Sequence, residues 1–169
     1  YKDIVTSNMY LFPSSLDLTA YRSIFETRRI GSSFLISLFV TIVGTGLGMI
    51  VSVAMAYSLS KSHVPGMKLA FGVVLLTMFF SGGMIPYYLT IKSLGLIDKV
   101  AVMILPTCVS VFNVIVLKNN FAQVPPSLEE SARIDGANDM TILFRIVLPT
   151  CKPILATIVL FYAVERWNE

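Results

Sequence analysis

The sequence has few charged residues and few of the side chains that usually carry catalysis. Only 14% of its 169 residues are charged, whereas soluble domains carry about 25%. It has one histidine and two cysteines, and no glycine-rich phosphate loop followed by lysine. No nucleophile has a base at a useful spacing. These absences predict a protein that is not an enzyme and that holds no cofactor or metal ion.

Basic residues are also too few and too scattered to form a binding patch. The net charge is +3 and no arginine- or lysine-rich run occurs, which excludes an electrostatic surface for nucleic acid. Cys108 and Cys151 lie far apart in apolar sequence, so two free buried thiols explain them better than a disulfide or a metal site. His63 has no metal-ligating neighbour, and a solvated loop histidine is the simpler interpretation.

Long uncharged apolar runs dominate the sequence instead. Hydrophobic residues make up 55% of the chain, a share typical of an integral membrane protein. Three of the runs approach or exceed the about 20 residues that a membrane-spanning helix needs. They predict membrane helices over 34–58, 67–90 and 100–118. A fourth apolar run, 153–164, is too short to predict a spanning helix by itself.

The first predicted helix carries closely spaced glycines. Gly44 and Gly48 are four residues apart, so they share one face, and small residues at this spacing let helices approach closely. With Gly46 they could be mistaken for a nucleotide-binding loop. Such a loop would need a preceding strand and a following Gly-Lys-Ser/Thr, and the sequence has neither.

The interval 125–149 is rich in polar residues, yet it carries signals of regular structure. Pro125 and Pro126 end what precedes them. Ser127 and Glu130 form a capping-box pattern, which predicts that a helix begins there. Gly136 stands where a helix commonly ends in the left-handed conformation.

A second short helix is predicted after this glycine. Asn138 or Asp139 can cap its start, and Leu148-Pro149 closes it. Its apolar stripe would consist of Met140, Leu143, Phe144 and Val147. The interval therefore predicts a helix, a glycine corner and a second helix.

This interval resembles the EAA loop of type I ABC importer permeases, the MetI-like inner-membrane components of binding-protein-dependent transport. The residues that match are Glu130, Ser131, Ala132, Asp135, Gly136, Ile146, Leu148 and Pro149. The family usually has alanine where this chain has Ser131. The runs FSGGMIPYYLTIKSLGLIDKVAVMILP, EESARIDGANDM and FYAVERWNE further resemble carbohydrate permeases of the LplC/YtcP kind. The resemblance covers essentially the whole chain.

The resemblance implies an all-α, polytopic helix bundle in which residues 1–169 are a fragment of one transmembrane domain. It implies a fourth spanning helix over 150–166, an external loop over 1–30, and further segments before and after the chain. Glu165 and Arg166 depart from the family, and we expect them to pair with neighbouring residues at the membrane interface. Lysines and arginines number six on one predicted side and seven on the other, so charge does not decide the orientation. The resemblance alone places 125–149 in the cytoplasm.

The resemblance also implies partners. They are an ATP-binding cassette ATPase dimer, a second homologous permease and an extracellular substrate-binding protein, in a bacterial plasma membrane and for a sugar or oligosaccharide. By this likeness, Glu130, Ser131, Ala132 and Gly136 contact the ATPase, which hydrolyses the ATP. A secondary transporter is disfavoured, because the long apolar runs carry no ionisable residue for ion coupling. A non-transporting scaffold is the other alternative, and it would not co-purify with an ATPase.

Two parts of the apolar runs are candidates for the translocation pathway. Ser81, Gly82 and Gly83, with Pro86, should end or distort the second helix, and irregular backbone at membrane depth must be buried in protein or line a cavity. A kinked packing element explains them equally well. The other candidates, at three-residue spacing, are Thr107, Ser110 and Asn113. They either line a pathway or form hydrogen bonds between helices.

Overall fold

The computed structural model describes residues 28–61, 64–80 and 82–168, and every regular element within them is a helix. The chain divides into two units, Tyr1–Ile36 and Ser37–Glu169. In the first unit, the described residues 28–36 are helical. Most of the predicted external loop, together with His63 and Ser81, lies outside the described residues. The account below concerns the second unit.

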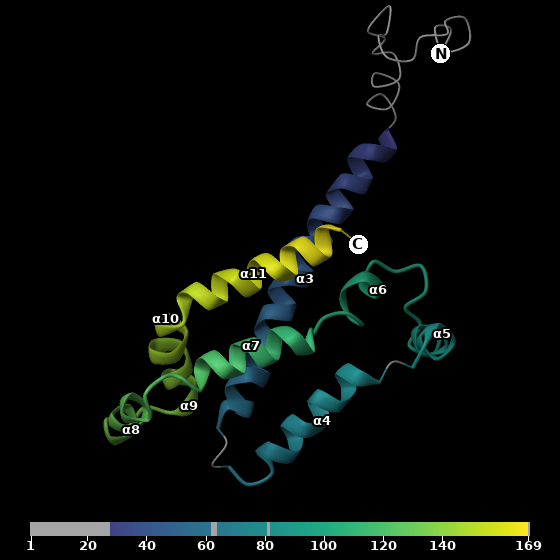
Figure 1. Ribbon diagram of the computed structural model, residues 1–169. Helices are drawn as coiled ribbons and strands as arrows, with labels where there is room; N and C mark the ends of the chain where they lie inside the picture. The colour runs from purple at the N-terminus through teal and green to yellow at the C-terminus, as the bar shows by residue number, and fades with distance from the viewer. Residues whose placement is uncertain (1–27, 62–63, 81, 169) are drawn as a thin grey trace, which may run out of the picture. The chain divides into compact units, whose positions relative to one another are not determined.

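Helix α3 spans Arg28–Ser60 and so begins before the predicted start at residue 34 (Figure 1). Its segment Ile30–Ser60 is the one helix in the described part of the chain that is long and apolar enough to cross a membrane unaided. Buried residues concentrate in its later turns and include Ser52, Ala56 and Tyr57. Those turns therefore pack against protein, while the large exposed apolar residues Ile42 and Ile50 suit lipid or a partner helix.

The predicted helix over 67–90 is not continuous. In its place are α4, Met67–Phe79, and α5, Met84–Ser93. The break ends at Gly83, whose φ of +79° lies in the left-handed region that favours glycine. Pro86 does not end a helix; it lies in the first turn of α5, where its missing N–H costs no intrahelical bond.

The predicted helix over 100–118 is also broken. Helix α6 covers only Ala101–Ile104, and α7 runs Val111–Phe121. The break contains Pro106, which supplies no backbone donor. Residue Ser110, just before α7, has extended backbone.

The rest of the described chain forms a bent series of short helices and one long helix. Helix α8 is Pro126–Ile134 and α9 is Asp139–Ile142; a π-helical turn, η1 at Leu143–Val147, leads into α10, Leu148–Thr150. Helix α11, Lys152–Trp167, lies close to the predicted 150–166. The segments Asp139–Thr150 and Lys152–Trp167 meet at 87°. Up to three spans qualify among the described residues if each bent helix pair counts as one.

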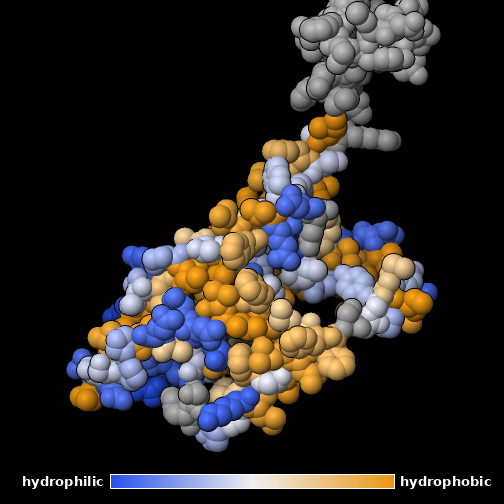
Figure 2. Space-filling model, in the orientation of Figure 1, coloured by the Kyte–Doolittle hydropathy of each residue, from blue (hydrophilic) through white to orange (hydrophobic). Residues whose placement is uncertain are grey.

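One apolar core joins these helices. It contains Ala56, Tyr57 and Leu59 of α3; Val114, Leu117 and Phe121 of α7; Val124; Ile142, Leu143 and Val147 of α9 and η1; Cys151; and Ile158 and Tyr162 of α11. Helix α8, all of which is described, contributes no buried residue. Figure 2 shows hydrophobic residues over much of the visible face and hydrophilic residues gathered where α8 lies. Thus the segment after Gly136 is anchored in the core, whereas α8 stays at the surface.

Candidate functional site

The first arm of the predicted elbow is α8, and it begins differently from the prediction. Pro125 occupies the N-cap position and Pro126 the first helical position, so the Ser127–Glu130 capping box is not what starts the helix. Proline suits the first position because its φ is pre-set and its missing N–H would have no partner there. The helix consequently begins one residue earlier than Ser127 and includes it.

The corner after α8 confirms the left-handed glycine predicted at residue 136. Gly136 has φ +83°. Its N–H donates to the carbonyl of Arg133 at 3.0 Å, and the N–H of Ala137 donates to the carbonyl of Ala132 at 2.9 Å. This pair of bonds is a Schellman motif, which satisfies the last carbonyls of the helix. The turn direction is therefore specified by backbone geometry at one residue.

The second arm is capped by Asn138, one of the two residues predicted for that position. The Asn138 Oδ1 accepts a hydrogen bond from the N–H of Thr141 at 2.8 Å. Arg133 on the first arm donates to the Asp139 carboxylate at 2.7 Å, but both side chains are largely exposed. Such an exposed pair contributes about 0.2–1 kcal/mol, so the corner depends mainly on its backbone bonds and its cap.

The apolar stripe of the second arm differs from the predicted one. Leu143 and Val147 are buried as expected and Ile142 joins them, whereas Met140 and Phe144 are 67% and 64% exposed. The π-helical turn at 143–147 adds a residue to one turn and so shifts the phase of the stripe. Pro149 provides a reason for this turn, because it cannot donate to the carbonyl four residues earlier and its ring crowds that carbonyl.

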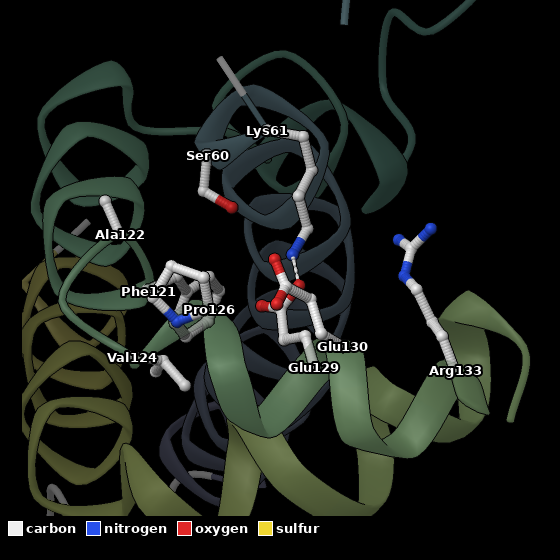
Figure 3. Close-up of a pocket in the computed structure, with 9 residues that line it drawn as sticks. All are labelled: Ser60, Lys61, Phe121, Ala122, Val124, Pro126, Glu129, Glu130 and Arg133. Atoms are coloured by element: carbon white, nitrogen blue, oxygen red, sulfur yellow. Dashed lines mark hydrogen bonds and ion pairs between the residues drawn. The ribbon is translucent and has the colours of Figure 1, made fainter. Parts of the chain in front are cut away.

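A salt bridge ties the exposed first arm to the end of α3. The Lys61 ammonium bonds the Glu129 carboxylate, and each side chain is only 15% exposed. The same ammonium lies 4.5 Å from the centre of the Tyr57 ring. Lys61 and Glu129 line a pocket of about 440 Å³, together with residues that include Glu130 and Arg133. Figure 3 shows the Lys61 ammonium directed at the Glu129 carboxylate, with Glu130 beside it. Glu129 thus faces the bundle.

Loss of this salt bridge should loosen α8. We expect Glu129→Gln to raise the rate of amide hydrogen exchange in α8 of the assembled subunit by about tenfold. The free energy that corresponds to this change lies between the contributions typical of exposed and of buried salt bridges. Asp139→Asn is the matched control, because it removes the exposed pair with Arg133 and should change the rate less than about twofold. Equal exchange rates in the two variants would contradict a special role for Lys61–Glu129.

The predicted coupling-loop residues differ in their exposure. Glu130, Ser131, Asp135, Gly136 and Pro149 are exposed, and Ala132, Ile146 and Leu148 are half-buried. Sequence reasoning did not single out Ile134, which is 86% exposed at the end of α8. A large apolar residue at the end of a mostly polar helix was the available signal. Ser131 and Ile134 thus present an outer face on α8, and Glu129 and Ala132 an inner one. Glu130 lies between the two faces, because it is exposed and also lines the pocket at Lys61.

A second polar assembly lies at the break between α6 and α7. Arg166 was expected at the membrane interface, but its side chain is buried, with 2% of the residue exposed. It donates to the carbonyl of Met103 at 2.8 Å and also to the carbonyl and hydroxyl oxygens of Thr107. The last carbonyls of a helix lack intrahelical partners, and a guanidinium can donate to several of them at once.

Tyr162 lies one turn before Arg166 and also holds this break. Its hydroxyl accepts the N–H of Ser110 at 3.0 Å and is 2.6 Å from the Ser52 hydroxyl on α3. Sequence reasoning missed Tyr162. The four-residue spacing to Arg166, which puts both side chains on one face of α11, could have indicated it.

The glycine face of α3 makes room for these side chains, which confirms the predicted close approach. A Cβ at Gly48 would lie 2.8 Å from the carbonyl oxygen of Cys108 and 3.2 Å from the Tyr162 ring. A Cβ at Gly44 would lie 3.2 Å from Nε of Arg166. A Cβ at Gly46, by contrast, would meet no described atom within 4 Å.

The candidate pathway residues are not gathered on one helix face. Gly82 and Gly83 lie in the α4–α5 break, and Ser81 is outside the described residues. Thr107 and Ser110 contact Arg166 and Tyr162, while Asn113 is buried within α7. The three-residue spacing assumed a continuous helix, and the break at 105–110 removes that premise. A pathway role for these residues stays a prediction.

Comparison with known proteins agrees with the resemblance to carbohydrate permeases. No family model matches the chain. The chain is 50% identical over 167 residues to the polygalacturonan/rhamnogalacturonan transport system permease protein YtcP of Bacillus subtilis, covering 99% of this chain and 58% of that protein. It is 44% identical to protein LplC of the same organism, covering 99% of this chain and 57% of that protein.

A solved structure gives the same result. One chain in the crystal structure of a bacterial ABC transporter involved in the import of the acidic polysaccharide alginate matches with TM-score 0.90 and 35% identity, over 99% of this chain and 60% of that one. The chain therefore spans less than two thirds of the length of these relatives. Over nearly its whole length the chain is therefore a homologue of ABC transporter permeases, and its relatives include permeases of carbohydrate transport systems.

Proposed function

We propose that this chain is part of the membrane-spanning permease subunit of an ATP-driven importer for sugars or oligosaccharides. The observation that carries the proposal is the elbow formed by α8, the Gly136 corner and the α9–η1 segment. Its first arm is exposed, and its second arm is anchored in the core. In this proposal the elbow receives mechanical work from a partner ATPase and passes it to the membrane helices.

In this proposal, α8 docks into a cleft of an ATP-binding cassette ATPase. Glu130 and Ser131 would make the outer polar contacts, and Ala132 and Gly136 are small enough to allow close approach. Ile134 would fill an apolar part of the cleft, since its side chain is 86% exposed in this chain. Burying such a side chain is worth about 1.5–3 kcal/mol. Asp135, Ile146, Leu148 and Pro149 would maintain the shape of the loop.

Movement of α8 would reach the membrane helices through the second arm. Ile142, Leu143 and Val147 are buried in the common core, so the arm cannot move without displacing its neighbours. The chain then turns by 87° into α11. Closure of the ATPase dimer would tilt the elbow, and the bundle would alternate between two arrangements of its helices.

The proposed setting is a bacterial plasma membrane, with about four spans contributed by this chain. Helix α3 is the first span; α4 with α5, α6 with α7, and α11 would supply the others as bent or broken helices. Broken helices are tolerated at membrane depth where they are buried in protein or line a cavity. The exposed apolar residues of α4 and α5 suit lipid or a second homologous permease.

The substrate class and the external partner come from the relatives. The names of two relatives refer to polysaccharides, which supports a carbohydrate cargo delivered by an extracellular substrate-binding protein. A secondary transporter is the alternative of another class. A secondary transporter needs ionisable residues within the bundle for ion coupling, and the buried Arg166 is one such residue. A secondary transporter would not, however, require the elbow. A non-transporting scaffold is the remaining alternative.

Isolation of the complex tests the proposal. A tagged full-length subunit should co-purify in mild detergent with an ABC ATPase and a second permease. The Glu130→Lys subunit should still co-purify with the second permease but no longer with the ATPase, because the substitution reverses an exposed charge on the docking face. Arg145→Glu, also exposed but on η1, is the control and should keep both. A wild-type subunit that binds no ATPase would contradict the proposal.

A further inference from the structure

We propose that Tyr162 and Arg166 are positioning residues for transport: they fasten the broken segment 105–110 to α11, so that this segment moves with α11. The inference rests on the proposed function, because it describes how movement of the elbow would reach the pathway. It adds a specific mechanical connection between α11 and a candidate pathway segment. Neither residue is proposed to contact ATP or the ATPase.

Helix α11 holds both ends of the break. Arg166 bonds the carbonyl of Met103 in α6 and both oxygens of Thr107, at the start of the break. Tyr162 accepts the N–H of Ser110, at its end. These bonds are mostly to backbone, so they fix the path of the chain; the bond to the Thr107 hydroxyl involves a side chain within the break. A broken helix needs such partners for its unpaired backbone groups.

Helix α3 is shaped to fit this junction. Gly44 faces Arg166, and Gly48 faces both Tyr162 and the carbonyl oxygen of Cys108. Ser52, one turn further on, is 2.6 Å from the Tyr162 hydroxyl. These three residues are four apart, so they form one face of α3 against which the segment and α11 both lie.

Helix α11 also connects this junction to the elbow. Helix α11 is unbroken from Lys152 to Trp167. Its buried residue Ile158 belongs to the same core as Leu143 and Val147 of the second arm. A helix of this length transmits displacement along its axis, so a tilt at Cys151 moves Tyr162 and Arg166. The segment 105–110 must then follow, unless its bonds to α11 break.

Cys108 provides a direct reporter, because it lies inside the segment and is partly exposed. The 169 residues contain two cysteines, so Cys151→Ser leaves Cys108 as the one thiol of this chain. The probe is N-ethylmaleimide, applied to the intact transporter in lipid, and the readout is the labelling rate of Cys108. Tyr162→Phe and Arg166→Lys should each raise this rate about tenfold, since each removes hydrogen bonds that hold the segment closed.

Matched controls separate this effect from general loosening. Tyr87→Phe alters an exposed tyrosine of α5, and Arg145→Lys alters an exposed arginine of η1. Both should leave the labelling rate within about twofold of the parent. Tyr162→Phe keeps the buried ring and removes one oxygen, so it should not prevent folding. Labelling at the parental rate in Tyr162→Phe and Arg166→Lys would overturn the proposal.

A second readout asks whether the connection serves transport. Adding MgATP should change the labelling rate of Cys108 in the parent and in the two controls, but about tenfold less in Tyr162→Phe and Arg166→Lys, with ATPase binding retained. An undiminished response to MgATP in these variants would overturn the proposal. Failure of the proposed function is distinguishable, because the parent itself would then bind no ATPase and show no response. In that case the proposed role of Tyr162 and Arg166 in transport would also be excluded. Faster labelling of Cys108 in the variants would still show that the two residues fasten segment 105–110 to α11.

Discussion

Replacement of Gly136 by proline should abolish ATP-driven uptake while leaving the subunit in the membrane. The N–H of Gly136 donates to the carbonyl of Arg133, and its φ is +83°. Proline has no N–H and a φ near −65°, so it can adopt neither feature. The corner would open and the two arms would lose their relative direction. The measurement is uptake by membrane vesicles that contain the full transporter, normalised to the amount of subunit in the membrane.

A graded series at this position isolates the backbone conformation as the cause. A Cβ at Gly136 would meet no described atom within 4 Å, so steric clash does not contribute. Gly136→Asn should retain most uptake, because asparagine tolerates the left-handed region. Gly136→Ala should give an intermediate loss, since the strain is about 1–2 kcal/mol. Equal uptake in the proline and asparagine variants would exclude the corner as the cause.

Replacement of Gly48 by alanine should destabilise the helix bundle strongly for so small a change. The new Cβ would lie 2.8 Å from the carbonyl oxygen of Cys108, a backbone atom that cannot rotate away. Overpacking of this kind costs about 1–3 kcal/mol. It outweighs the about 0.5–1 kcal/mol that alanine gains over glycine within a helix. The midpoint of unfolding of the purified transporter in detergent should fall.

Gly46→Ala is the matched control on the same helix. Its Cβ would meet no described atom within 4 Å, so only the helix-propensity gain remains, and the midpoint should stay or rise slightly. The midpoint of unfolding of Gly44→Ala should lie between those of Gly46→Ala and Gly48→Ala, because the neighbour of Gly44 is the side chain of Arg166, which can shift. If Gly48→Ala were as stable as Gly46→Ala, close packing of 105–110 against α3 would be contradicted.

Patterns within a few residues predicted the elbow well. Gly136 and Asn138 occupy the corner and the cap because left-handed backbone and N-capping are local requirements of one residue each. The capping box at Ser127 was wrong because Pro126 starts the helix earlier. The stripe with Met140 and Phe144 was wrong because the π-helical turn changes the period on which the stripe was counted.

Contacts between residues that lie far apart in the sequence could not be predicted from the sequence. Arg166 was expected at the membrane interface because it departs from the family at the end of an apolar run. Its acceptors at Met103 and Thr107 come from more than fifty residues away in the sequence. The pathway candidates were grouped by helical spacing across residues 105–110, where the helix does not continue. Lys61 and Glu129 also meet only because α8 folds against the end of α3.

The sequence alone determined the class of protein, the apolar helices and the glycine corner, because composition and short-range backbone preferences are properties of neighbouring residues. The tertiary structure alone decided that a buried arginine and tyrosine of α11 hold the 105–110 break, and that Gly44 and Gly48 admit them. The reason is physical: a broken helix leaves backbone groups without partners, and the donors and acceptors that satisfy them can come from any part of the chain that packs close enough.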